Sequence, residues 1–366
     1  MSPKQSPANN GQEQQITPFA DLMALEHLEK STRILGAPTD KPEVVETFQS
    51  VSLPFSPGAG QRAFGGHVFA QSAYAASKTV KRGFVIHNIM GSFILAGRLD
   101  VPFVYTVRHV RDGGVYCMRA VDVRQNGNVC FSCICSFKRL ETRFSYGYQP
   151  AVDLHEKYQS VLEDKKPEDH PLAPGVDADW WMRAVEMGEI EEGEFAGVDL
   201  RRVDMRKYNR TEEIRKNPHK YRQLQFYRIK GSPDSTIQDL NQLEKNDREG
   251  EYDNLYACAH LYASDKNSLM VIPRSLGQSE SWTAMASLSC TVIFHQHGDA
   301  LRMLDWDVTE QGEKRSREKW FCQEAWSPAS GGSRGLYESR LWSLDGTLLA
   351  TTMQDSMLRY KAPQKL

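Results

Sequence analysis

A helix followed by antiparallel strands occurs twice in this chain, and this repeat limits the fold more than any other feature of the sequence. In the first half, small and apolar residues spaced i, i+4, i+7 and i+11 predict a helix over 65–80. Turn signals separate the strand-like segments that follow this helix, at 87–95, 103–111, 115–125 and 129–138. The pattern predicts a helix packed on an antiparallel meander.

The second half repeats this order. A helical stripe covers 254–264, and strand signals follow at 287–295, 301–308, 319–326, 336–344 and 348–360. The closing hairpins of the two halves also align, since Gln125-Asn126-Gly127 matches Leu344-Asp345-Gly346 and 130–139 matches 349–358. A repeat of roughly 200 residues indicates duplication of a whole domain.

Changes in composition suggest how the chain is divided. Residues 1–16 are rich in Gln, Asn, Ser and Pro and predict a disordered tail. We expect a first domain over 17–145, a polar linker over 146–180, and a second domain over 181–366 with a polar insertion near 231–251.

Composition excludes several kinds of partner. A net charge of −2 over 366 residues provides no field for a polyanion, so we expect no nucleic acid. The longest apolar stretch, 85–97, is too short to cross a bilayer, so no membrane span is expected. Seven cysteines, an odd number, fit free thiols in a reducing compartment better than disulfides.

Several sequence blocks resemble one known family. They are AFGGHVFAQSAYAASKTV and FVYTVRHVRDGGVYCMRAVDVRQNG in the first half, and LYASDKNSL, ASLSCTVIFH and ASGGSRGLYESRLWSLDGTLLATTMQD in the second. In this order they resemble the type II acyl-CoA thioesterases. The resemblance implies an α+β double hotdog fold, two helix-wrapped antiparallel sheets in tandem, and hydrolysis of an acyl-CoA to a free acid and coenzyme A.

The same resemblance implies a site of three residues: the carboxylate of Asp265, the hydroxyl of Ser287 and the amide of Gln354. In the family such groups orient a water that attacks the thioester carbonyl, so no cofactor and no metal are expected. Backbone N–H groups at Gly65 and Gly66, which begin a predicted helix, are candidates for stabilising an anion.

Each assignment competes with a structural alternative. Asp265 would point inward if its helix continued that far, or it would cap the turn after the helix. Ser287 and Gln354 each fit an exposed position on a strand. Ser289 and Cys290 stand where the family commonly has Asp and His, so the contacts around the site are expected to differ.

Further residues invite a functional reading that the pattern does not favour. His67 and His87 lack a predictable catalytic partner, and structural roles are favoured. Cys-x-x-Cys at Cys130 and Cys133, followed by Cys135, suggests a metal, but no second pair lies at zinc-ribbon spacing. Arg334 fits either the nucleotide of coenzyme A or a structural carboxylate.

Two rival functions follow from the same blocks. An enoyl-CoA hydratase would need Asp-x-Asn-Pro-x-His, but Ser268 and Met270 replace the proline and the histidine after Asp265. A non-catalytic acyl-binding protein is made credible by Ser289 and Cys290. A serine hydrolase is disfavoured because no Gly-x-Ser-x-Gly motif occurs.

Assembly and location are expected as follows. Because Cys135 occupies the position in the first half that Gln354 occupies in the second, we expect one active site per chain. The chain should be a pseudo-dimer whose halves pair edge to edge, with further homo-oligomers formed by outer surfaces. Gln364-Lys365-Leu366 resembles a peroxisomal address, so a peroxisomal or cytoplasmic location is expected.

Overall fold

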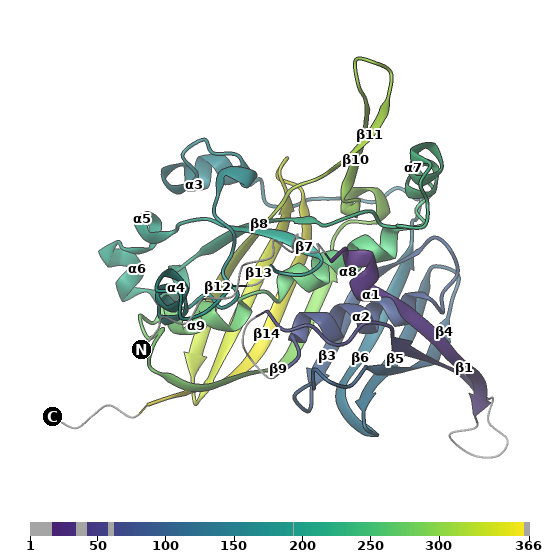
Figure 1. Cartoon of the computed structure of the whole chain (residues 1–366), viewed down its shortest axis with the longest axis horizontal. Coiled ribbons are helices and arrows are strands. Elements are labelled where there is room, and N and C mark those ends of the chain that lie inside the picture. The colour runs from purple at the N-terminus through teal and green to yellow at the C-terminus, as the bar shows by residue number, and fades with distance from the viewer. Residues whose placement is uncertain (1–16, 34–41, 58–61, 193, 362–366) are drawn as a thin grey trace, which may run out of the picture.

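A twelve-stranded antiparallel sheet forms the body of the protein in a computed structural model that describes residues 17–33, 42–57, 62–192 and 194–361 (Figure 1). From one edge to the other, its strands are β1 (Leu25–Arg33), β2 (Glu43–Ser50), β4 (Val104–Asp112), β5 (Tyr116–Gln125), β6 (Asn128–Arg139), β3 (Phe84–Phe93), β9 (Trp282–Phe294), β14 (Leu348–Tyr360), β13 (Arg334–Ser343), β12 (Phe321–Gly331), β8 (Gln223–Ile229) and β7 (Val198–Arg202).

The strand order is symmetric about its centre, as a duplicated domain predicts. Going outward, β3, β6, β5, β4, β2 and β1 correspond in chain order to β9, β14, β13, β12, β8 and β7. The halves join where β3 pairs with β9, with Met90 opposite Thr291 and Gly91 opposite Cys290. The two hotdogs therefore pair edge to edge, and the predicted double hotdog fold is confirmed.

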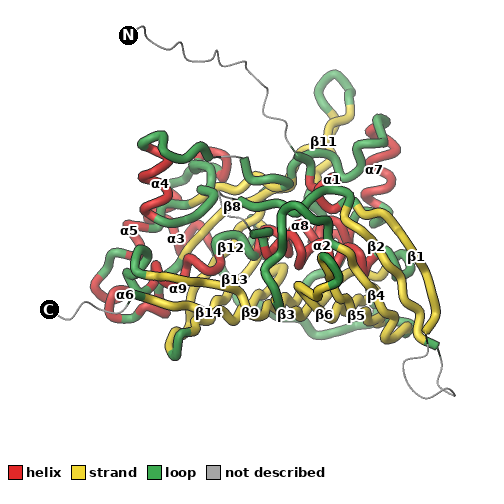
Figure 2. Tube along the Cα trace, turned by 60° about the horizontal axis from the view of Figure 1, so that its bottom comes forward, coloured by secondary structure: helices red, strands yellow, loops and turns green. Residues whose placement is uncertain are grey.

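Each half wraps its sheet around one buried helix, α2 (Gly65–Ser77) or α8 (Asp253–Ser264). Both helices are rich in alanine, and their small side chains let the two helices pack against each other and against the strands. Figure 2 shows the central strands side by side along the lower edge, with α2 and α8 above them. The buried apolar core is continuous across both halves.

The second half carries additions that the first half lacks. Segments over 146–220, between the two hotdog domains and between β7 and β8, include α3 (Leu154–Leu162), α4 (Asp179–Glu186), α5 (Arg206–Asn209), α6 (Glu212–Lys216) and the short helices η1 (Pro167–Asp169) and η2 (Pro218–Lys220). Later additions are α7 (Leu240–Arg248), α9 (Ser268–Ser275) and η3 (Gly298–Leu301). The remaining helix, α1 (Phe19–Met23), precedes β1.

Two elements of the second half, β10 (Leu304–Val308) and α9, differ from the sequence prediction. The strand expected over 301–308 is not in the main sheet: β10 pairs only with β11 (Lys314–Glu318) in a separate hairpin. Four of the five residues of β11 are charged, so the strand that pairs with β10 has no apolar face to bury in the core. Helix α9 was not predicted, because Pro273 lies inside it.

Three further predictions concern the cysteines, membrane-spanning helices and the two ends of the chain. The seven cysteines are buried free thiols. No helix among the described residues is long and apolar enough to span a membrane. The predicted tail over 1–16 and the ending Gln364-Lys365-Leu366 lie outside the described residues, so the location of the protein stays a prediction.

Candidate active site

Asp265 lies at the end of α8, where the two halves meet. Helix α8 ends at Ser264 and Asp265 is its C-cap, yet the side chain is buried at 8% exposure. Both readings of this residue from sequence were therefore partly right. The Asp265 carboxylate accepts a hydrogen bond from the backbone N–H of Gly66, at the start of α2 in the other half. The positive end of one helix thus faces a carboxylate from the other.

Glycine at the start of α2 makes this approach possible. A Cβ atom at Gly65 would lie 2.9 Å from Oδ2 of Asp265 and 3.2 Å from the ring of Phe93. Burial raises the pKa of Asp265 to about 7, although the hydrogen bonds from Ser268 and Gly66 and the charge of Lys266 act in the opposite direction. A carboxyl group with this pKa can gain and lose a proton near neutral pH.

A chain of hydrogen bonds links Asp265 to the sheet. The Ser268 hydroxyl, at the start of α9, donates to Oδ1 of Asp265 at 3.1 Å. Nε2 of Gln354, on β14, donates to Oγ of Ser268 at 3.1 Å and to Oγ of Ser287, on β9, at 3.0 Å. Oε1 of Gln354 is buried with no hydrogen-bond donor among the described residues. The network therefore retains one free acceptor.

A cavity of about 340 Å³ adjoins this network at the junction of the halves. Its wall includes Gly65 and Ser287, and among the described residues its other lining side chains are apolar except for Arg62. The first half contributes Val68, Phe93, Phe103 and Cys130, and the second contributes Leu269, Met285 and Leu288. The chain thus brings Asp265, Ser287 and Gln354 together beside an apolar space that both halves form.

Sequence reasoning missed two groups in this region. Ser268 was considered as part of the turn that Asp265 would cap and as a departure from a hydratase motif, but not as a member of the site, although its i+3 spacing from Asp265 could have indicated a contact. Lys266 was not singled out. Its ammonium group is buried and donates to the carbonyl oxygens of Pro174 at 2.6 Å and Gly175 at 2.7 Å.

Lys266 therefore ties the segment before α4 onto the turn that carries Asp265. The side chain of Asn267 joins this contact, since its Oδ1 accepts from Nζ of Lys266 at 3.2 Å and from the N–H of Asp177 at 3.3 Å. Asn267 has a φ of 61°, a left-handed conformation that asparagine tolerates better than most residues. The segment predicted as a linker thus packs against the candidate active site.

The remaining sequence candidates lie outside the network. Nδ1 of His67 accepts from the N–H of Phe55 at 3.1 Å, and burial lowers the pKa of His67 to about 4, so its ring is neutral. Nδ1 of His87 contacts the carbonyl of Ser136 at 3.2 Å. Arg334 pairs with the carboxylate of Asp355 on the neighbouring strand, at 2.5 Å, and has a structural partner.

The structure also shows where the residues lie that depart from the family and hydratase patterns. Cys290 is buried opposite Gln354 on the paired strands β9 and β14, and Ser289 lies opposite Asp355. Met270, at the position of the hydratase histidine, packs in an apolar cluster with Trp181. The only acid or base within the hydrogen-bonded network is therefore Asp265, among the described residues.

The duplicated domain and the cavity at its junction define a double hotdog protein, and comparisons specify the family. The model of the acyl-CoA thioesterase N-terminal domain matches residues 54–138, and that of the C-terminal domain matches 147–358. The chain therefore belongs to the acyl-CoA thioesterase family, whose members are thioester hydrolases.

Individual proteins agree with this assignment. The chain is 27% identical over 304 residues to acyl-coenzyme A thioesterase 8 from Mus musculus, covering 82% of this chain and 81% of that protein. It is 21% identical to acyl-CoA thioesterase 2 from Haemophilus influenzae, covering 82% and 88%. The acyl-CoA thioesterase II structure from Mycobacterium marinum shares its fold, with a TM-score of 0.58, 22% identity, and coverage of 95% and 99%.

Proposed function

We propose that this protein hydrolyses acyl-CoA thioesters with a water molecule activated by Asp265. One observation carries the proposal: a buried carboxylate, linked by hydrogen bonds to Ser268, Gln354 and Ser287, lies beside an apolar cavity at the junction of the two halves. An acyl chain fits the apolar wall, and the thioester would then lie next to the polar network.

Water is the nucleophile in this mechanism. A water near Asp265 donates one hydrogen bond to the carboxylate, which removes its proton as the oxygen attacks the thioester carbonyl. The buried Oε1 of Gln354 is free to accept the second hydrogen bond of the same water. Holding water by both of its hydrogens directs a lone pair at the carbonyl, and this orientation lowers the entropic cost of attack.

Charge then develops on the thioester oxygen. Gly65 lines the cavity at the start of α2, where backbone N–H groups are free of partners within the helix. Its N–H is a fixed donor for the oxyanion, aided by the positive end of the helix. Collapse of the tetrahedral intermediate releases coenzyme A as a thiolate, which takes up a proton, and leaves a free acid.

Release of free thiol from an acyl-CoA tests this proposal. Asp265→Asn keeps the volume of the side chain but removes the base, so turnover should fall by about 10² or more. Near-native thiol release by this variant would remove Asp265 from the mechanism. An inactive wild-type protein that still binds acyl-CoA would instead favour the alternative of a non-catalytic acyl-binding protein, to which Cys290 beside Gln354 had pointed.

A further inference from the structure

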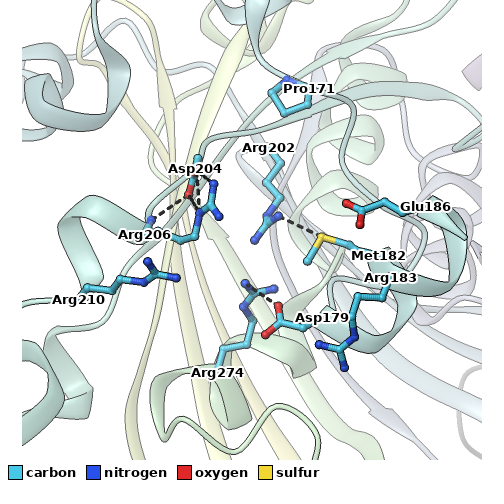
Figure 3. A pocket seen from close by; sticks show the side chains of 10 residues that line it. All are labelled: Pro171, Asp179, Met182, Arg183, Glu186, Arg202, Asp204, Arg206, Arg210 and Arg274. Atoms are coloured by element: carbon cyan, nitrogen blue, oxygen red, sulfur yellow. Dashed lines mark hydrogen bonds and ion pairs between the residues drawn. The ribbon is translucent and has the colours of Figure 1, made fainter.

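A second cavity, lined mainly by polar and charged side chains, lies on the additions to the second half, at the far end of α9 from Ser268. Two adjoining spaces, of about 430 and 320 Å³, share part of their walls. Figure 3 shows arginine side chains from α4, the end of β7, α5 and α9 converging on the larger space. We call the combined space the arginine cavity and define it by Arg202, Arg206, Arg210, Arg215 and Arg274.

These guanidinium groups are not fully neutralised by their neighbours. Arg202 and Arg274 share one buried carboxylate, Asp177, at 3.2 and 2.5 Å. Asp179 lies 3.7 Å from Arg274, and Arg206 is paired with Asp204. Arg183, on the opposite rim, is paired with Glu280, whereas Glu186 on that rim faces the larger space.

Two further arginines have no carboxylate partner among the described residues. Arg210 is exposed and makes no ion pair with the other residues drawn in Figure 3, and Arg215 donates only to the backbone carbonyl of Arg210, at 2.8 Å. Even with Asp177, Asp179 and Glu186 counted against the four arginines other than Arg206, a positive surplus remains. In a chain of net charge −2 this surplus favours an anion, and planar guanidinium groups suit phosphate oxygens.

The cavity also has features that a small inorganic anion would not use. Oε1 of Gln223 is buried and lacks a hydrogen-bond donor, and Gln223 lines the smaller space. Apolar atoms of Val203, Met205 and Ile214 line the same space. A ligand that carries phosphate groups together with a ring and hydrogen-bond donors would satisfy all three features.

We propose that the arginine cavity binds a phosphorylated nucleotide, either the nucleotide end of the acyl-CoA substrate or a free nucleotide. The first source rests on the proposed function. Helix α9 connects the two sites, since Ser268 at its start contacts Asp265 and Gln354, and Arg274 near its end lines the arginine cavity. Its eight residues span about 12 Å, and the pantetheine arm of coenzyme A is longer than this.

Direct binding of adenosine 3′,5′-bisphosphate, measured by calorimetry, tests the site without relying on catalysis. Arg210→Glu reverses one exposed, unpaired charge and should raise the Kd by about tenfold or more. The matched control is Arg33→Glu, which makes the same change on β1 at the opposite edge of the sheet and should leave the Kd within about twofold. Absence of binding, or equal binding by the Arg210 variant, would overturn the proposal.

Kinetics then separate the two sources. If the cavity holds the nucleotide end of the substrate, Arg210→Glu should raise KM for acyl-CoA but not for an acyl-pantetheine, which lacks the nucleotide. If the ligand is a free nucleotide, neither KM should change, although bisphosphate binding is still weakened. A wild-type protein that releases no thiol yet binds the bisphosphate through Arg210 would refute the proposed function and leave the nucleotide site intact.

Discussion

The two ends of the helix pair α2 and α8 occupy equivalent places in the duplicated fold, but only one of them holds Asp265 and the network on which the proposed function rests. We call this end the active end and the other the inactive end. At the active end, α2 begins with Gly65 and Gly66, and α8 ends with Asp265 as its C-cap. At the other end, α8 begins with Asp253 and Asn254, and α2 ends with Lys78 as its C-cap. Duplication therefore preserved the frame while the two helix junctions diverged.

Strand registers extend this comparison to the sheet. Cys135 on β6 is equivalent to Gln354 on β14, and the pairing of these strands with β3 and β9 makes Ile86 equivalent to Ser287. At the inactive end the side chain of Asn254 binds the backbone of β3: its Oδ1 accepts from the N–H of Ile86 at 2.9 Å, and its Nδ2 donates to the carbonyl of Phe84 at 2.8 Å. At the active end α2 begins with glycine, and the Asp265 carboxylate lies where a Cβ atom at Gly65 would need space.

The largest difference between the ends should appear at Gln354. Gln354→Ala removes the amide that holds Ser268 and Ser287 and orients the water, so thiol release should fall by about 10². Cys135→Ala, at the equivalent position in the first half, should keep turnover within about twofold of wild type. Equal losses from both substitutions would mean that the two ends contribute alike, contrary to a single active site.

Hydrolysis should lose activity at acidic pH. Burial raises the pKa of Asp265 to about 7, and a base must be deprotonated to act, so kcat/KM should rise with pH to a plateau above about 7. At two pH units below that midpoint, kcat/KM should be about 100-fold lower than on the plateau. Burial also raises the pKa of Asp253, at the inactive end, to about 6. Asp253→Asn should leave the midpoint of the rate profile unchanged, and a midpoint near 4 in wild type would contradict the raised pKa of Asp265.

Substitutions at the first residues of the two helices should have smaller effects, on catalysis at the active end and on stability at the inactive end. Gly65→Ala places a methyl group 2.9 Å from Oδ2 of Asp265, so the carboxylate must move, and kcat should fall by about tenfold. Asn254→Ala should leave kcat near wild type but lower the free energy of unfolding by about 1–2 kcal/mol, since two backbone groups lose their partner. Denaturation and turnover measured on both variants check this; a loss of activity from Asn254→Ala would show that the inactive end supports catalysis.

The sequence predicted the elements that the duplication repeats and that show a regular apolar period. Helix and strand periods placed α2, α8 and the closing hairpins within a few residues, because each buries one regular face in the core. The meeting of Asp265 with Gly65 was not predictable, since it depends on how two helices distant in sequence pack against each other. Helix α9, with Pro273 inside it, carries no regular signal, so the contact of Ser268 with Gln354 also escaped prediction.

The smallest expected effect concerns two lysines at the C-terminal ends of the paired helices. Lys266 follows the C-cap of α8, and Lys78 is the C-cap of α2. Lys78 is exposed and donates to the hydroxyl of Tyr74, whereas Lys266 is buried beside Asp265. The charge of Lys266 lowers the pKa of Asp265, so Lys266→Met should move the midpoint of the pH profile upward by a fraction of a unit. That shift corresponds to about a twofold to threefold loss of kcat/KM at pH 7, and Lys78→Met should produce none.

The plateau of the same profile separates two roles of Lys266. If the ammonium acts through charge alone, Lys266→Met should reach the wild-type rate above the shifted midpoint, because Asp265 is then ionised in both proteins. The substitution also leaves the carbonyls of Pro174 and Gly175 without their donor, and a buried acceptor without a partner costs about 1–3 kcal/mol. A lowered plateau would therefore show that Lys266 positions the turn carrying Asp265, and an unchanged midpoint would exclude its electrostatic effect on that carboxylate.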